Sequence, residues 1–167
     1  GASRSLVLRV KAPSDARTNM LSFKVTPAWR TPGNTDLITG AAVTAKLRVT
    51  SERGADQSSV DRAASIEIVK LWQAWIIWKV ADLNRSRDYR KVEQFLAREL
   101  SELKQFCARV PEAAPIEREV AEFAKVAFKE WDEAQRKEIQ HSTYLTSQSQ
   151  SDKRSRGSQG WKDQFQS

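Results

Sequence analysis

Lysine and arginine side chains alternate with apolar side chains along several segments of the N-terminal third of the chain. These basic positions are Arg9, Lys11, Lys24, Lys46 and Arg48. Residues two apart lie on the same face of a β-strand, so the spacing predicts a sheet with one basic face. Hydroxyl side chains fall between the basic ones, at Thr26, Thr44 and Thr50. A row of cationic and hydroxyl groups is suited to contacting the phosphates of a nucleic acid.

The same basic residues have a second interpretation. Lys and Arg that point outward from a sheet also protect its edges from aggregation. The predicted basic face has no aromatic side chain on which a base would stack, as most proteins that bind single strands have. The alternation therefore leaves both a phosphate-binding face and a solvated face open.

Two further basic groups lie outside the predicted strands. One consists of Arg85, Arg87, Arg90 and Lys91, and the other of Lys153, Arg154 and Arg156. The chain has 28 Lys and Arg against 21 Asp and Glu, a net charge of +7, yet residues 61–150 contain fifteen of each sign. The excess positive charge therefore lies at the two ends, where it suits contact with RNA or another polyanion, or serves as a solubilising tail.

Residues that commonly catalyse reactions are scarce. The only histidine, His141, has no nucleophile or orienting carboxylate nearby in the sequence, and Cys107 falls on the apolar stripe of a predicted helix. None of the six glycines forms a phosphate-binding loop. The carboxylates alternate with Lys and Arg, which indicates solvated helix faces rather than metal ligands; they are Glu93, Glu99, Glu102, Glu117, Glu119, Glu122, Glu130, Asp132, Glu133 and Glu138. We expect no enzyme activity and no catalytic, cofactor-binding or metal-binding residue.

Three tryptophans, Trp72, Trp75 and Trp78, recur at spacing three within an apolar helical segment. Aliphatic residues fill the opposite side of this helix, namely Ile66, Val69, Ile76, Ile77 and Val80, so protein or lipid must enclose most of it. The tryptophans either pack in the core, which we favour, or form a surface that docks on a partner, where aromatic side chains are common anchors. Four polar or charged residues interrupt the apolar segment, namely Glu67, Lys70, Gln73 and Lys79, so we do not expect it to span a membrane.

Three segments of the N-terminal third have the period of two that is typical of half-buried strands, around Leu6–Val10, Leu21–Val25 and Val43–Val49. Turn-forming residues separate them, including Pro32-Gly33-Asn34. The simplest arrangement is an antiparallel sheet of three strands within residues 1–57. Its apolar face needs a cover, which the tryptophan helix is able to supply.

Residues 58–140 have the period of an amphipathic helical protein. We predict three helices, over residues 58–83, 87–109 and 115–140, with Ser58 and Asp61 capping the first. Pro111 and Pro115 interrupt the pattern between the second and third helices, which should pair as an antiparallel hairpin. Residues 141–167 are rich in Ser and Gln, so we expect a disordered tail. Trp161 and Phe165 in this tail either form a short protein-binding motif or are isolated aromatic residues that a disordered tail tolerates.

The sequence thus predicts an α+β protein in which an N-terminal three-stranded sheet packs on a three-helix unit. We expect a non-enzymatic structural or assembly subunit that docks on other chains through the tryptophan helix and the helical hairpin, while its basic ends contact RNA or another polyanion. Coat-like subunits and subunits of ribonucleoprotein particles fit this description. The alternative is an accessory subunit that contacts only protein or the surface of a membrane. The single cysteine excludes an internal disulfide and favours an intracellular site, and the start Gly1-Ala2-Ser3 is typical of a cleavage remnant.

Overall fold

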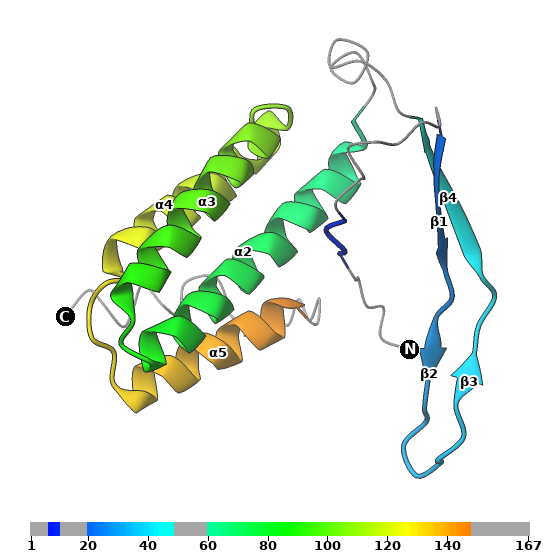
Figure 1. Cartoon of the computed structure of the whole chain (residues 1–167), viewed down its shortest axis with the longest axis horizontal. Coiled ribbons are helices and arrows are strands. Elements are labelled where there is room, and N and C mark those ends of the chain that lie inside the picture. Colours follow the sequence, from blue (N-terminus) through cyan, green and yellow to red (C-terminus); the bar gives the residue numbers. More distant parts are fainter. Residues whose placement is uncertain (1–6, 11–19, 49–59, 148–167) are drawn as a thin grey trace. The chain divides into compact units, whose positions relative to one another are not determined.

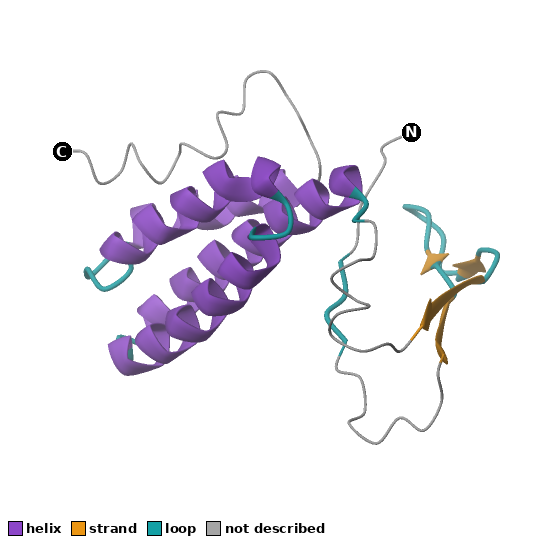
Figure 2. Ribbon diagram, turned by 90° about the horizontal axis from the view of Figure 1, so that it is seen from above, coloured by secondary structure: helices purple, strands orange, loops and turns teal. Residues whose placement is uncertain are grey.

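A computed structural model shows a protein with both helices and strands, and it describes residues 7–10, 20–48 and 60–147 (Figure 1). The chain divides into a β-hairpin unit within Arg9–Ser59 and a helical unit that includes Val60–Ser147. The helices form one bundle and the strands form one ribbon (Figure 2). The α+β class predicted from the sequence is confirmed, although the number of strands and helices differs from the prediction.

The β-hairpin unit is built on strands β1 (Met20–Val25) and β4 (Val43–Arg48), which pair antiparallel with Met20 opposite Arg48. The short strands β2 (Ala28–Trp29) and β3 (Ile38–Thr39) pair closer to the turn. The three-stranded sheet was therefore a wrong prediction, because residues 7–10 form no strand. A period of two shows that a segment has two different faces, but it does not supply a hydrogen-bonding partner.

Two glycines shape this hairpin. The turn carries Pro32 at its second position and Gly33, with φ of +83°, at its third, and the N–H of Asn34 donates to the carbonyl oxygen of Thr31 at 3.1 Å. These are the features of a type II turn, which favours proline and glycine at these two positions. At the junction of the two ladders, a Cβ on Gly40 would lie only 3.0 Å from the ring of Pro27.

The helical unit is organised around α2 (Arg62–Arg85), which packs against the other three helices. These are α3 (Tyr89–Cys107), α4 (Ala114–Val126) and α5 (Glu133–Ser147), with the short 3-10 helix η1 (Pro111–Ala113) before α4. In Figure 1, α2 lies between α3 and α5. The buried core contains the aliphatic side of α2 that the sequence predicted, namely Val69, Ile76, Ile77 and Val80. The predicted pairing of the second helix with the third is present as the contact of α3 with α4.

The predicted third helix, 115–140, is two helices. The chain leaves the helix after Val126 and starts α5 at Glu133, and α5 runs past residue 140 to Ser147. The side chain of Asp132 accepts from the N–H of Gln135 at 2.8 Å, and the Gln135 side chain accepts from the N–H of Asp132 at 3.0 Å. This reciprocal capping begins a new helix at a position where the apolar pattern alone predicts a continuous one.

The other helix starts differ little from their predicted positions. Asp61 caps α2 by accepting from the N–H of Ala64 at 2.9 Å, while Ser58, the predicted cap, lies outside the described residues. Asp88 caps α3 in the same way through Lys91. Among the described helices, none has the length and apolar character needed to cross a bilayer.

Candidate functional site

An open groove of about 470 Å³ runs between α2 and α5 of the helical unit. Among the described residues, those that line it are Leu71, Ala74, Trp75, Trp78, Gln140, Thr143 and Tyr144. The aromatic ones are well exposed, at 41% for Trp75, 44% for Trp78 and 57% for Tyr144. Exposed aromatic side chains that surround a groove are uncommon on a surface that contacts only water, so the groove is the leading candidate for a functional site.

The helical geometry of α2 explains why two of the three tryptophans lie at the surface. A step of three residues falls about 60° short of a full helical turn, so a row at this spacing moves around the helix. Trp72 faces α3, where its ring meets the edge of Phe106 at a centroid distance of 6.1 Å. Trp78 faces the groove beside α5. The core packing that we favoured for all three tryptophans is thus wrong for Trp75 and Trp78.

Neighbouring side chains outside the groove contact both of its tryptophans. Trp75 makes an edge contact with Phe95 of α3 at 5.2 Å between ring centroids, and the guanidinium of Arg98 lies 5.9 Å from the centre of the Phe95 ring. The ammonium group of Lys79 lies 5.8 Å from the centre of the Trp78 ring. Aromatic walls fixed in this way lose little conformational entropy when a ligand binds.

A buried carboxylate holds α3 against α2 next to the groove. Glu99 has no exposed surface, and it accepts a hydrogen bond from Trp72 Nε1 at 3.0 Å and forms an ion pair with Arg98 at 3.1 Å. Nearby, Glu119 of α4 accepts from the side-chain amide of Gln73 at 2.9 Å. Assigning these two carboxylates to solvated faces was therefore incorrect: each faces α2, where a donor satisfies it.

The wall formed by α5 depends on how the loop before it is anchored. Trp131 is buried against Phe123 at 5.8 Å between ring centroids, and its Nε1 donates to the carbonyl oxygen of Val126 at the end of α4. The side-chain amide of Asn84 donates to the carbonyl oxygens of Ala127 and Lys129 at 3.2 and 2.8 Å. These bonds engage carbonyl groups at the end of α4 and in the loop that follows it, and those from Asn84 tie this loop to α2.

Sequence reasoning missed the groove residues of α5, which are Gln140, Thr143 and Tyr144. It ended the helix at residue 140 because Ser and Gln dominate from there on. The signals that would have found them are the Asp132 and Gln135 capping pair and the spacing of Ile139 and Thr143, both buried and four residues apart.

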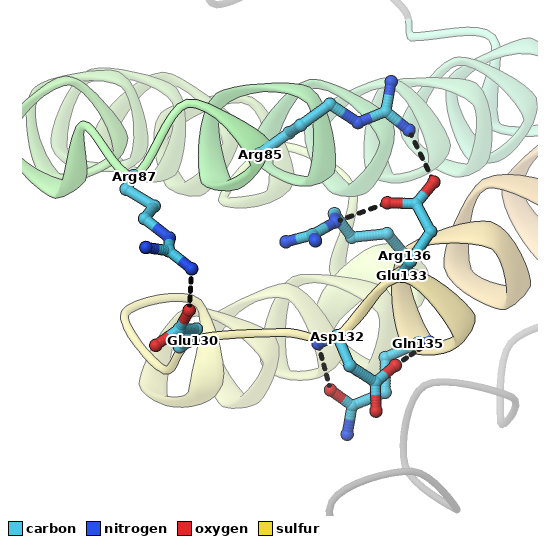
Figure 3. A network of polar contacts seen from close by, with 7 residues as sticks. All are labelled: Arg85, Arg87, Glu130, Asp132, Glu133, Gln135 and Arg136. Carbon is cyan, nitrogen blue, oxygen red and sulfur yellow. Dashed lines mark hydrogen bonds and ion pairs between the residues drawn. The ribbon is translucent and has the colours of Figure 1, made fainter.

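The basic group between α2 and α3 is engaged with acidic residues of the same unit. Arg85, the last residue of α2, pairs with Glu133, the first residue of α5, at 3.3 Å, and Arg87 pairs with Glu130 of the loop before α5. Both pairs are drawn in Figure 3. Lys91 pairs with Asp88 at 2.7 Å. Hydrogen bonds from Lys91 hold the pKa of the Asp88 carboxyl below its usual value. Of the four predicted nucleic-acid-binding residues here, only Arg90 is described without such a pair. The paired side chains of Arg85, Arg87 and Lys91 are more than half exposed, and ion pairs of this kind are weak, so contact of this group with a polyanion stays a prediction.

On the β-hairpin unit, the register places Lys24, Lys46 and Arg48 on one face together with Ser22 and Thr44, because directly opposed residues share a face. Arg9 is exposed in the described segment 7–10. The remaining predicted binding residues lie outside the described residues: Lys11, Lys153, Arg154, Arg156, Trp161 and Phe165. The structure thus assembles part of the predicted basic face.

The described residues contain no cluster typical of a metal site. They include no group of three His, Cys, Asp or Glu side chains able to hold a metal ion. Cys107 is buried, and burial, together with the nearby charge of Glu117, raises the pKa of its thiol, which opposes formation of the reactive thiolate. His141 is exposed on α5. The chain matches no protein-family model, and no curated protein or solved structure is similar to it.

Proposed function

We propose that this protein is a non-enzymatic docking subunit whose helical unit binds a partner protein in the groove between α2 and α5. The observation that carries the proposal is the groove itself, with Trp75, Trp78 and Tyr144 exposed on helices that are packed in place. Its position between two helices suits an amphipathic helix of the partner, which would insert apolar side chains at helical spacing. Aromatic side chains of this kind commonly supply most of the binding energy of an interface.

A peptide library displayed on phage tests this proposal, because selection from a library requires no named partner. Peptides selected on the whole protein should carry apolar residues at spacings of three and four and should bind with micromolar affinity. Trp78→Ala and Tyr144→Ala should each weaken binding about tenfold or more, since each removes an aromatic wall of the groove. Both side chains are substantially exposed, at 44% and 57%, so the variants should remain folded.

Phe128 supplies the matched control, because it is an aromatic residue of similar exposure, 45%, that does not line the groove. Phe128→Ala should leave the affinity for the selected peptides unchanged. Selected peptides that bind Trp78→Ala as tightly as the unmodified protein would exclude the groove as the docking site.

A second candidate function, contact with RNA or another polyanion, is favoured by the shared face of Lys24, Lys46 and Arg48. Three phosphate contacts predict a salt dependence of about −2 in log affinity per log salt for single-stranded RNA, or a loss of about 20-fold between 50 and 200 mM salt. Fluorescence anisotropy with a labelled RNA of mixed sequence measures this slope directly.

Two triple variants distinguish RNA binding by the basic face from RNA binding that depends only on net charge. Changing Lys24, Lys46 and Arg48 to Gln should abolish RNA binding. Changing Lys70, Lys104 and Lys129 to Gln removes the same charge from exposed positions of the helical unit and should preserve it. If both variants lose the same affinity, the basic face has no special role, and the groove remains as a site for protein partners only.

A further inference from the structure

The basic face of the ladder between β1 and β4 consists almost entirely of side chains that donate hydrogen bonds. Directly opposed residues share a face, and the register brings these side chains together: Ser22, Lys24, Thr44, Lys46 and Arg48. All five are exposed, and the sixth member of the face is Met20. The opposite face offers no such groups, because each of its three cross-strand pairs is apolar. The ribbon therefore has a single face that is able to form polar contacts with a ligand.

The cations of the basic face are spread evenly along it. Arg48, Lys46 and Lys24 occupy three successive rungs of this face, about 7 Å apart, because residues two apart in a strand rise by that distance. A hydroxyl side chain stands opposite Lys46 and another stands opposite Lys24. Asp36, the only carboxylate in residues 20–48, lies between β2 and β3 rather than in this ladder. The face thus suits a ligand that is anionic and rich in hydrogen-bond acceptors.

The shape of the ribbon selects among nucleic acids. In the part of the chain that the structure describes, β1 and β4 form a two-stranded sheet. The major groove of B-form DNA, about 12 Å wide, admits a two-stranded β-ribbon, whereas the minor groove is only about 6 Å wide. The major groove of double-stranded RNA is too deep and narrow for side chains to read. Proteins that bind single strands stack the bases on aromatic side chains, and the basic face contains none.

We propose that the basic face lies in the major groove of B-form DNA and contacts the edges of the bases. Lys and Arg donate to O6 and N7 of guanine, while Ser and Thr hydroxyl groups pair with several bases. The proposal rests on the second candidate function, contact with a polyanion, and names that polyanion as duplex DNA. Six residues of each strand rise about 20 Å, and B-form DNA rises about 3.4 Å per base pair, so the face spans about six base pairs.

Selection from a library of random duplex DNA tests the proposal on the whole chain, because it requires no known site. The chain should enrich a site of about six base pairs that contains guanine. Fluorescence anisotropy then compares the selected DNA duplex with an RNA duplex of the same sequence and with each separated DNA strand. The DNA duplex should bind at least about tenfold more tightly than any of them. A glucosyloxymethyl group on C5 of every cytosine projects into the major groove and should weaken binding by at least the same factor.

Lys46→Gln and Arg48→Gln should each weaken binding to the selected duplex about tenfold, because each removes a contact with a base. Ala45 supplies a matched control, since it precedes Lys46 and lies on the opposite face. The double variant Lys46→Gln, Ala45→Lys has the net charge of the unmodified chain, and it should bind as weakly as Lys46→Gln alone. These positions are exposed, so the variants should fold, and circular dichroism checks this.

Recovery of affinity in the double variant would overturn the proposal, because net charge rather than the basic face would then determine binding. Failure to enrich any sequence would also overturn it. Equal affinity for the RNA duplex, for a separated strand or for the glucosylated DNA would overturn major-groove binding and leave contact with a polyanion in place. If no nucleic acid binds, the polyanion function fails together with the proposal. None of these outcomes affects the peptide-binding test of the groove between α2 and α5.

Discussion

At the scale of single residues, the buried side-chain amide of Asn84 holds the loop that precedes α5, and α5 forms one wall of the groove. Only 1% of its surface is exposed, and its Nδ2 group serves two carbonyl oxygens of the loop between α4 and α5. Its Oδ1 atom is buried without a hydrogen-bond partner among the described residues. The sequence suggested a simple helix end at this position, and nothing in the local pattern shows which distant carbonyl groups the amide meets.

We expect Asn84→Asp to destabilise the protein by about 3 kcal/mol at neutral pH, because it removes the donor and buries a charge against carbonyl oxygens. Those surroundings would raise the folded-state pKa of the new carboxyl group above its unfolded value. The loss should therefore appear as the pH rises above about 4 and should shrink below it. Urea unfolding at pH 4 and pH 7 measures the effect. Gln94→Glu, the same chemical change at an exposed position of α3, should cost less than about 0.5 kcal/mol.

At the scale of elements, the break between α4 and α5 decides whether a groove exists. Residues 127–132 contain no glycine or proline, and the apolar stripe of α4 continues through them, so local propensity favours one long helix. Trp131 instead folds back on Phe123, and the capping pair of Asp132 and Gln135 starts α5 in a new direction. Burial of a large aromatic ring outweighs the small propensity differences along the loop.

Asp132→Ala should lower the free energy of unfolding by about 1 kcal/mol, which is typical of a lost helix cap. The loss should be concentrated in α5, so its amides should exchange with solvent faster while those of α3 change little. Hydrogen exchange followed by mass spectrometry resolves the two helices. Asp82→Ala, which removes only an exposed pair with Lys79, is the control. Equal acceleration in α3 and α5 would contradict a local capping role.

At the scale of the whole molecule, the buried core belongs to the helical unit. Its members run from Val69 on α2 to Ile139 on α5, and all lie within residues 60–147. The β-hairpin unit has by contrast an apolar face that is largely exposed. Among the described residues, burial of apolar side chains therefore stabilises mainly the helical unit.

Residues 60–147 alone should therefore unfold cooperatively, with a midpoint within a few degrees of that of the helical transition in the full chain. Thermal melts followed by far-ultraviolet circular dichroism compare the two directly. A fragment that melts without cooperativity would show that the helical unit depends on the rest of the chain for its stability.

Periodicity and turn chemistry alone determined the strands β1 and β4, the presence of a turn at Pro32-Gly33-Asn34, the aliphatic side of α2 and the shared face of Lys24, Lys46 and Arg48. Each depends on residues close in sequence, whose spacing already states which face they share. Tertiary structure decided the exposure of Trp75 and Trp78, the burial of Glu99 and the groove itself. It also decided that Arg85 and Arg87 each form an ion pair with a glutamate. Those features arise between helices that are far apart in the chain. Burial of Trp131 and the hydrogen bonds from Asn84 to carbonyl oxygens both stabilise the fold, and the residues that make them possible lie too far away in the sequence for a local pattern to show.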